Sequence, residues 1–272
     1  MTPPAERVSE PTSDPDIEVR TYFARGRNAL ISRGDFSEIF AAWYLHRMDH
    51  GIEIPAAMED VAREAIASIT LHSASRPWKE ACAWTVKFPE PRLNVFAAAD
   101  NHSGSVIANF QTSDLQPIGE GMFYADVVED AKPPPRSVVD CREKSFLRAV
   151  EVFYSQSEQR LVRFFWHGEE DLVMVAAQPD CDEEWLAGLT QESIHTLDRD
   201  VDLSLLEKRQ FTFRCGCNQE RMLDFMAPVF QRQADELFHS DPSISVLCPR
   251  CGARHILTRE ALEARTTKPS HE

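Results

Sequence analysis

The stretches Cys215-Gly216-Cys217 and Cys248-Pro249-Arg250-Cys251-Gly252 decide the fold of the last quarter of this chain. Thirty residues, 218–247, separate the two cysteine pairs. In the second stretch a turn brings two sulfurs within reach of one metal ion, and Gly252 permits the backbone conformation that follows. Four unrelated buried cysteines are the alternative, but two close pairs among seven cysteines rarely arise by chance. Because structural Zn²⁺ prefers four Cys or His ligands in a tetrahedron, we predict a zinc site formed by Cys215, Cys217, Cys248 and Cys251.

The composition is that of a folded, acidic protein. Hydrophobic residues make up 43% of the chain and charged residues 27%, and 272 residues suffice for one substantial core and a smaller module. The formal net charge of −15 argues against a nucleic-acid partner, because phosphate binding requires a basic surface. The predicted zinc module, residues 211–265, balances seven Arg against seven acidic residues, so it also lacks a basic surface.

We expect neither a secretory signal nor a membrane span. Residues 1–7 lack the apolar stretch of a signal peptide. Residues 172–177 are among the longest apolar runs, which is far too short to cross a bilayer. Seven cysteines in a chain that is not secreted indicate metal or redox chemistry rather than a disulfide scaffold. We therefore predict a cytoplasmic protein without a membrane partner.

Hydrophobic periodicity predicts an α+β fold, in which helices accompany a mainly antiparallel sheet. Helical spacing of apolar residues follows Asp35, a plausible N-cap, and recurs after Pro55 and over 146–154. The segments do not alternate in the βαβ rhythm of a parallel sheet. Strand-like segments cover residues 17–24, 29–31, 82–88, 93–99, 106–110, 122–128, 161–166 and 172–177.

Composition divides the chain into five segments. Residues 180–208 carry nine acidic groups against Arg199 and Lys208, with enough apolar residues for one or two amphipathic helices. On the residues alone, such a segment could equally be a solvated connector. We predict a disordered tail over 1–15, a core domain over 16–179, an acidic helical linker over 180–210, a zinc-binding domain over 211–265 and a tail over 266–272.

A four-thiolate site can also act as a switch. A module of ~55 residues has a marginal hydrophobic core, and structural zinc contributes on the order of 10–16 kcal/mol to folding. Thiolate sulfur is the form that oxidants attack, and oxidation to disulfides ejects the metal. Many such sites are shielded from oxidants, so the residues alone leave a purely structural site open.

The spacing C-x-C-x30-C-x-x-C resembles the heat-shock protein 33 family of redox-regulated holdase chaperones. Three further segments are similar to that family: CNQER at 217–221, FYSQSEQ at 153–159 and VMVAAQP at 173–179. The resemblance implies an ATP-independent chaperone whose core domain binds unfolding client proteins under oxidative stress. It also implies a reduced, inactive form that holds Zn²⁺. Oxidation would then form Cys215–Cys217 and Cys248–Cys251 disulfides, release zinc and permit a homodimer.

A second function stays open. Only 35 residues separate Pro179 from Cys215, fewer than members of that family usually carry in their linker. The alternative is a constitutive protein-interaction protein whose zinc knuckle is purely structural, without redox switching.

We do not expect an enzyme. The sequence Gly119-Glu120-Gly121 is only a fragment of a phosphate-binding loop, and His167 has no partnered nucleophile. Cys82 falls on an alternating strand and is predicted to lie in the core, whereas Cys141 and Cys181 are isolated. Near the zinc module, His239 and His255 could also be ligands, but four cysteines already satisfy a tetrahedral ion.

Overall fold

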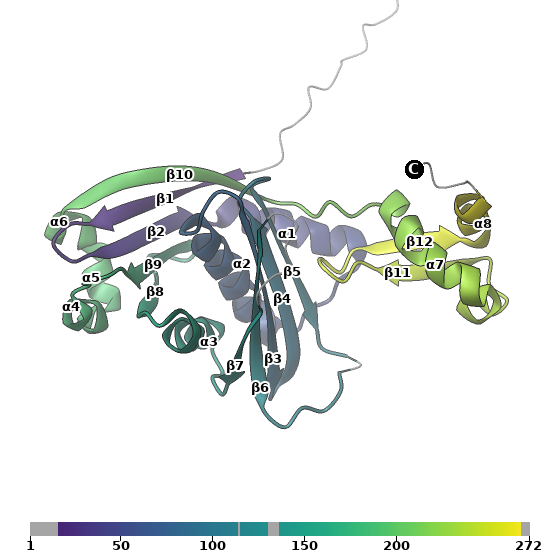
Figure 1. Cartoon of the computed structure of the whole chain (residues 1–272), viewed down its shortest axis with the longest axis horizontal. Coiled ribbons are helices and arrows are strands. Elements are labelled where there is room, and N and C mark those ends of the chain that lie inside the picture. Colours follow the sequence, from purple (N-terminus) through teal and green to yellow (C-terminus); the bar gives the residue numbers. More distant parts are fainter. Residues whose placement is uncertain (1–15, 114, 130–135, 268–272) are drawn as a thin grey trace, which may run out of the picture.

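A computed structural model gives the structure of the protein and describes residues 16–113, 115–129 and 136–267. A large domain built on a ten-stranded sheet is joined to a smaller C-terminal module with a two-stranded sheet (Figure 1). The predicted tail over 1–15 lies outside the described residues, as do residues 268–272 of the second tail and the Pro133–Pro135 loop.

The large sheet is mainly antiparallel, as predicted. Every pairing within it is antiparallel except one, in which residues 212–213 pair in parallel with residues 105–106. In spatial order the strands are β7 (Arg136–Cys141), β6 (Gly121–Glu129), β3 (Glu80–Pro89), β4 (Arg92–Asp100), β5 (Ser105–Gln111), β10 (Leu203–Phe213), β1 (Asp16–Ala24), β2 (Ala29–Asp35), β9 (Asp171–Ala177) and β8 (Val162–Trp166).

The three predicted helical segments all form helices. They are α1 (Ser37–His50), α2 (Glu59–Ala74), which follows the 3₁₀ turn η1 (Ala56–Met58), and α3 (Phe146–Phe153), which continues into the π turn η2 (Tyr154–Glu158). Asp35 accepts a hydrogen bond from the Ser37 backbone N–H at 2.9 Å, close to the predicted cap, although Phe36 occupies the N-cap position itself. The sheet bends strongly, and α2 lies in the angle of the bend (Figure 1).

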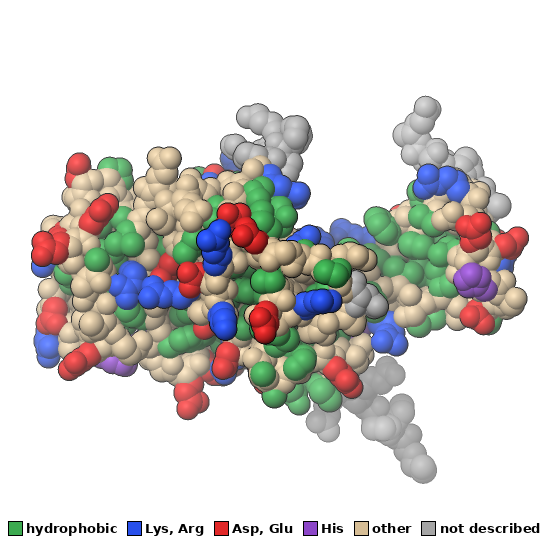
Figure 2. Space-filling model, turned by 90° about the horizontal axis from the view of Figure 1, so that it is seen from below, with side chains coloured by type: hydrophobic (Ala, Val, Ile, Leu, Met, Phe, Trp, Pro, Cys, Tyr) green, Lys and Arg blue, Asp and Glu red, His purple; other side chains and the backbone are tan. Residues whose placement is uncertain are grey.

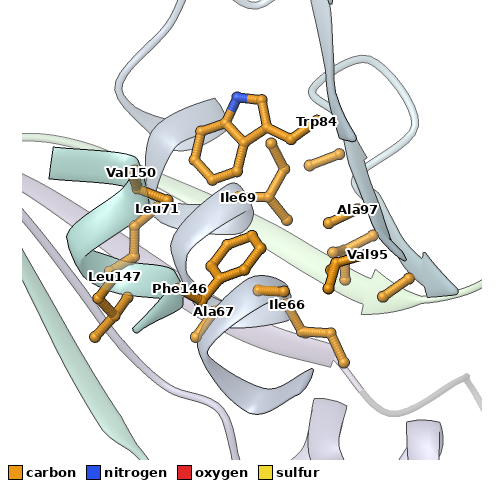
Figure 3. Close-up of a cluster of buried hydrophobic side chains, with 14 of the residues drawn as sticks. Ile66, Ala67, Ile69, Leu71, Trp84, Val95, Ala97, Phe146, Leu147 and Val150 are labelled. Carbon is orange, nitrogen blue, oxygen red and sulfur yellow. The ribbon is translucent and has the colours of Figure 1, made fainter. Parts of the chain in front are cut away.

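Helix α2 is the centre of the main core. Its C-terminal half, from Ala65 to Ala74, is buried on every side, as expected of a helix enclosed by other elements. Ile69 lies close to Trp84 of β3 and Ile66 close to Val95 of β4, with α3 covering the far side (Figure 3). Each large apolar side chain buried here contributes about 1.5–3 kcal/mol to folding.

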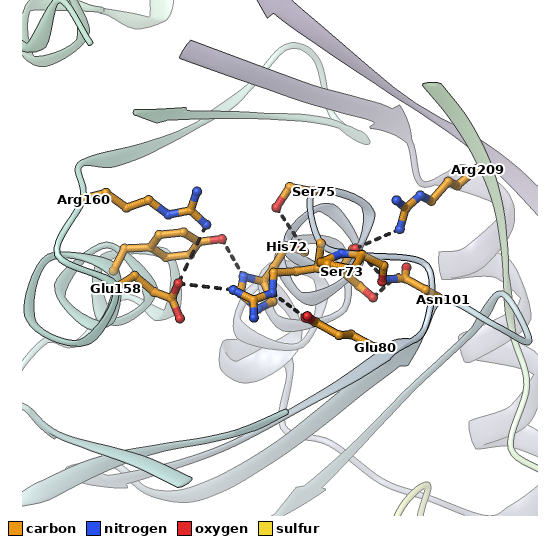
Figure 4. A network of polar contacts seen from close by, with 11 residues as sticks. His72, Ser73, Ser75, Glu80, Asn101, Glu158, Arg160 and Arg209 are labelled. Carbon is orange, nitrogen blue, oxygen red and sulfur yellow. Dashed lines mark hydrogen bonds and ion pairs between the residues drawn. The ribbon is translucent and has the colours of Figure 1, made fainter. Parts of the chain in front are cut away.

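Polar residues at the end of α2 form a buried network (Figure 4). His72 Nδ1 and the Tyr154 hydroxyl are hydrogen-bonded at 2.5 Å. Arg76 pairs with Glu80 at 2.7 Å and with Glu158 at 3.3 Å. The network therefore joins α2 to β3 and to η2, so that the Gln-Ser-Glu-Gln segment at 156–159 lies at a structural junction.

The predicted acidic linker is helical over only part of its length. Three short helices, α4 (Glu183–Gly188), α5 (Gln191–His195) and α6 (Leu197–Asp200), pack on β2, β8 and β9 through Leu186, Leu189, Ile194 and Leu197. Residues 203–210, also predicted as helical linker, instead belong to β10, which pairs with β1 along that strand's whole length. The reason is that β10 buries Phe211 and Phe213 in the main core.

The C-terminal module has a small core of its own. It consists of α7 (Gln219–Phe238), β11 (Ser243–Leu247), β12 (Arg254–Thr258) and α8 (Arg259–Thr267). Asn218 caps α7 by accepting the Arg221 backbone N–H at 2.9 Å, and the helix is interrupted at Gln233. The buried residues of this apolar core are Met222, Leu223, Phe230, Phe238, Leu257 and Leu262. Among the described residues, no helix has the length and apolar character needed to cross a membrane.

Candidate metal centre

The two cysteine pairs lie in turns that the neighbouring elements hold face to face. Cys215 and Cys217 occupy the connection between β10 and α7, and Cys248 and Cys251 occupy the turn between β11 and β12. In that turn, the Gly252 N–H donates to the Cys248 carbonyl and the Cys248 N–H to the Ala253 carbonyl, each at 2.8 Å. Gly252 has a φ of +75°, a conformation that suits glycine, as its position in the sequence indicates.

The four sulfur atoms converge on one point. All of them lie within 4.8 Å of one another, and the structure brings together no other such group among its described His, Cys, Asp and Glu residues. The Cys215 and Cys248 sulfurs are 3.9 Å apart, and those of Cys217 and Cys251 are 3.6 Å apart. Tetrahedral Zn²⁺ with Zn–S bonds of ~2.3 Å requires S···S separations of roughly 3.8 Å. The arrangement therefore fits a four-coordinate metal ion.

The electrostatics of the cluster also favour a cation. Burial and the nearby Cys215 raise the pKa of Cys217 to about 12. Hydrogen bonds from the Cys215 and Cys251 thiols lower the pKa of Cys248, whereas the contacts with Cys215 and Cys248 raise that of Cys251. Without a metal, one ionised sulfur thus suppresses ionisation of its neighbours, because like charges this close repel. A divalent ion would remove that repulsion and allow all four thiolates to form.

The knuckle formed by residues 248–252 contacts the large domain directly. His46 Nε2 of α1 donates to the Cys251 carbonyl oxygen at 3.0 Å, and Asn109 Nδ2 of β5 donates to the Pro249 carbonyl oxygen at 3.0 Å. Burial lowers the pKa of His46, which favours the neutral ring in this contact. Sequence reasoning missed both contacts, because the partners are 205 and 140 residues apart and no local pattern joins them.

None of the other candidates for chemistry belongs to the four-sulfur group. Cys82 and Cys141 are buried, the former in the core as predicted, and burial raises the pKa of Cys82 to about 12. Cys181 is half-buried at the start of the linker. His167 lies 3.8 Å from an Asp171 carboxylate oxygen. Neither His239 nor His255 belongs to the group of four sulfurs.

Comparison with known proteins finds a family profile and several relatives that match this chain. The family profile described as Hsp33 protein matches residues 169–258, which include all four cysteines. The 33 kDa chaperonin of Nitrosococcus oceani is 19% identical over 85% of this chain and 89% of that protein. The corresponding chaperonin of Edwardsiella ictaluri is 23% identical over 86% of this chain and 90% of its own length.

A solved structure has the same fold. The crystal structure of the 33 kDa chaperonin (heat shock protein 33 homolog) of Thermotoga maritima aligns with a TM-score of 0.69 at 15% identity, covering 93% of this chain and 97% of that one. Profile, relatives and fold thus agree with one another and with the cysteine spacing. In its profile match, its relatives and its fold, this chain is therefore similar to the Hsp33 family of chaperones.

Proposed function

We propose that this protein is a redox-regulated, ATP-independent holdase that protects unfolding proteins from aggregation under oxidative stress. The observation that carries the proposal is the convergence of four sulfurs within 4.8 Å in a segment that matches the Hsp33 family profile. In the reduced, inactive form, Cys215, Cys217, Cys248 and Cys251 would hold Zn²⁺. Oxidation would join Cys215 to Cys217 and Cys248 to Cys251, and the metal would leave.

Loss of the metal should open the C-terminal module, which we propose as the redox-switch domain over residues 211–265. Bound Zn²⁺ would supply on the order of 10–16 kcal/mol of folding free energy. The six buried residues of the module's own apolar cluster cannot replace that contribution, because a core of this size is marginal. A disulfide within each cysteine pair would also end the contacts of Cys215 with Cys248 and of Cys217 with Cys251. These contacts join two turns that are more than thirty residues apart in the sequence.

Strand β10 connects the metal centre to the linker helices. Arg214 alone separates Cys215 from the end of β10, and the last two residues of the strand pair with Ser105 and Val106 of β5. The other end of β10 leads directly into α6. When the module opens, β10 loses its C-terminal support, and the helices that cover β2, β8 and β9 are freed with it. The apolar surface uncovered in this way would hold unfolding clients.

The same chemistry sets the expected partners and compartment. Four metal-binding thiolates persist in a reducing compartment, so we propose a cytoplasmic location. The partners would be unfolding client proteins, with a homodimer in the oxidised form and no nucleic acid or membrane. The net charge of −15 supports the exclusion of nucleic acid.

The test measures zinc release and chaperone activity in the same sample. Reduced protein is treated with hydrogen peroxide at a temperature where the module opens, while a chelating dye records zinc and light scattering records aggregation of a thermally unfolding client. The expected result is one zinc released per chain together with suppressed aggregation. A Cys181→Ser variant, which lacks a half-buried cysteine outside the cluster, should behave like the wild type. Zinc retention, or equal suppression by both redox forms, would favour an interaction protein with a structural zinc knuckle.

A further inference from the structure

A cavity of about 240 Å³ lies directly beside the metal centre. Three of the four cysteines, Cys215, Cys217 and Cys248, line it. Cys215 and Cys217 are half-buried, whereas Cys248 and Cys251 are buried, so the cavity reaches both of the more accessible cysteines of the cluster. A molecule bound here would therefore be in contact with residues that the proposed switch oxidises.

Apolar side chains also line the cavity, and two of them are highly exposed. They belong to Met222 and Phe225 of α7, to Val246 and Leu247 of β11, and to Pro249 in the turn after β11. Phe225 is 66% exposed and Leu247 58% exposed, although both are large apolar side chains. Apolar side chains also gather on the face of the C-terminal module seen in Figure 2. Such exposed apolar groups beside a cavity favour binding of an apolar ligand.

Two arginines complete the lining. Arg250 makes no ion pair with any carboxylate among the described residues, and Arg221 uses one guanidinium nitrogen to donate to the Gly216 carbonyl at 2.6 Å. Zn²⁺ with four thiolates carries a net charge of −2, which would repel an anion. The two guanidinium groups offset that charge and can pair with a carboxylate.

We propose that this cavity binds organic hydroperoxides that combine an apolar body with a carboxylate, and that it presents their O–O bond to the metal-site cysteines. The inference rests on the proposed redox function and names the class of oxidant for it. The volume suits a compound of roughly a dozen heavy atoms rather than a polypeptide segment. The apolar side chains would contact the apolar body, the guanidinium groups would pair with the carboxylate, and the thiolates would face the O–O bond.

The proposed reaction is a two-electron oxidation of two cysteines. A thiolate sulfur of Cys215 or Cys217 attacks the terminal oxygen of the hydroperoxide; the O–O bond breaks, and the alkoxide leaves and takes up a proton to become an alcohol. The sulfenic acid formed then reacts with a second cysteine thiolate, and a disulfide and hydroxide result, the latter protonated to water. Two thiolates, one hydroperoxide and two protons thus give one disulfide, one alcohol and one water.

The experiment compares three oxidants on the full-length zinc-loaded protein. Zinc-release rates are measured with hydrogen peroxide, cumene hydroperoxide and the para-carboxylate of cumene hydroperoxide, each divided by the rate for free cysteine. For the wild type we expect the normalised rate to rise in that order. Leu247→Ser should lower the rates with both organic hydroperoxides by roughly tenfold, the usual effect of losing an apolar contact, and leave the rate with hydrogen peroxide unchanged. Arg250→Ala should remove only the advantage of the carboxylate.

Matched variants separate binding from a general effect on the module. Ile256→Ser removes a similarly exposed side chain, 51% exposed on the neighbouring strand, outside the cavity, and should match the wild type with all three oxidants. Phe225→Ser provides a second cavity variant if Leu247→Ser loses zinc content. Equal normalised rates for all three oxidants in the wild type, or an equal loss with every oxidant in Leu247→Ser and Phe225→Ser, would overturn the proposal. Failure of hydrogen peroxide to release zinc would instead contradict the proposed redox function itself.

Discussion

The guanidinium group of Arg209 on β10 donates a hydrogen bond of 3.3 Å to the backbone carbonyl of Ser73 near the end of α2. Asn101 Nδ2 donates to the same carbonyl at 2.8 Å (Figure 4). Arg209 is only 4% exposed, pairs with Glu207 at 2.7 Å and lies 4.3 Å from the ring of Trp78. A buried cation therefore ties the strand that leads to the metal centre to the central helix of the core.

Replacing this cation should loosen β10. We expect Arg209→Ala to lower the free energy of unfolding by about 1–3 kcal/mol, because it leaves the partners of a buried charged group unsatisfied. In the reduced, zinc-loaded protein, limited proteolysis should then cut residues 180–202 faster while zinc content stays at one per chain. Urea unfolding and mass spectrometry of the fragments measure the two effects.

A second arginine on the same sheet serves as the control. Arg136 also has a carboxylate and an aromatic partner, Asp126 at 2.8 Å and Tyr124 at 5.9 Å, but it is exposed and distant from β10 in the sheet order. Arg136→Ala should leave both the unfolding midpoint and the cleavage pattern unchanged. Equal behaviour of the two variants would show that Arg209 does not hold β10.

The buried histidine of the α2 network predicts a pH dependence of stability. Burial lowers the pKa of His72 well below its ordinary value of 6.5, and the Arg76 and Arg160 cations lower it further. Below pH ~6.5 the unfolded chain binds a proton that the native state excludes. This contribution to stability is therefore complete above pH ~6.5 and decreases as the pH falls towards the native pKa, with a slope of at most about 1.4 kcal/mol per pH unit.

Two variants isolate this effect. The free energy of unfolding is measured between pH 7.5 and 5 by urea denaturation. His72→Gln should reduce the slope, and His102→Gln, which changes an exposed histidine, should leave it as in the wild type. Half-buried His46, whose pKa burial also lowers, adds a slope of the same sign that persists in both variants. An unchanged slope in His72→Gln would contradict the assignment.

The parts of the fold that sequence predicts are those with regular local patterns. Ala62, Ala65, Ile66 and Ile69 repeat at helical spacing, and Cys82, Trp84, Val86 and Phe88 alternate, so α2 and β3 could be predicted. Strand β10 was missed because a buried cation, Arg209, occupies an inward position beside Phe211 and Phe213. Acidic residues around β10 and the adjacent Leu205 and Leu206 also obscure the alternation of apolar and polar residues that predicts a strand.

The candidate site also has one part that the sequence predicts and one part that it does not. The four cysteines could be found from spacing, since each pair is local and its chemistry is specific. The positions of His46 and Asn109 against the knuckle depend on how the module packs on α1 and β5. Such packing is a property of tertiary structure, and no periodicity in either segment encodes it.

Metal content should depend on the cluster and not on cysteines elsewhere. Protein purified under reducing conditions should carry one zinc per chain, measured by elemental analysis. Cys248→Ser should lose most of it, because a hydroxyl is a harder and much less acidic ligand than a thiol. Cys82→Ser, a buried cysteine of the main core, should keep its zinc even if it is less stable. A Cys248→Ser protein with full zinc content would rule out the four-sulfur site.

Finally, the contact between the knuckle and the large domain should influence zinc affinity. A Cβ atom at Gly252 would lie 3.0 Å from Asn109 Oδ1 and 3.1 Å from Ile52 Cδ1, and the residue has a φ of +75°. Gly26 has nearly the same φ, +72°, but nothing within 4 Å of its Cβ position. Both Gly→Ala variants should therefore lose about 1–2 kcal/mol of stability from backbone strain alone.

Only Gly252→Ala should also weaken zinc binding, by on the order of tenfold if about 1.4 kcal/mol of strain is relieved when the knuckle opens. Competition with a zinc chelator measures the affinity. Adding Asn109→Ala to Gly252→Ala removes one of the two crowded contacts and should recover part of the loss, although it also removes the hydrogen bond to the Pro249 carbonyl. Equal zinc affinities of the Gly252→Ala and Gly26→Ala variants would mean that the large domain does not constrain the knuckle. The metal centre would then respond to oxidants independently of the core beside it.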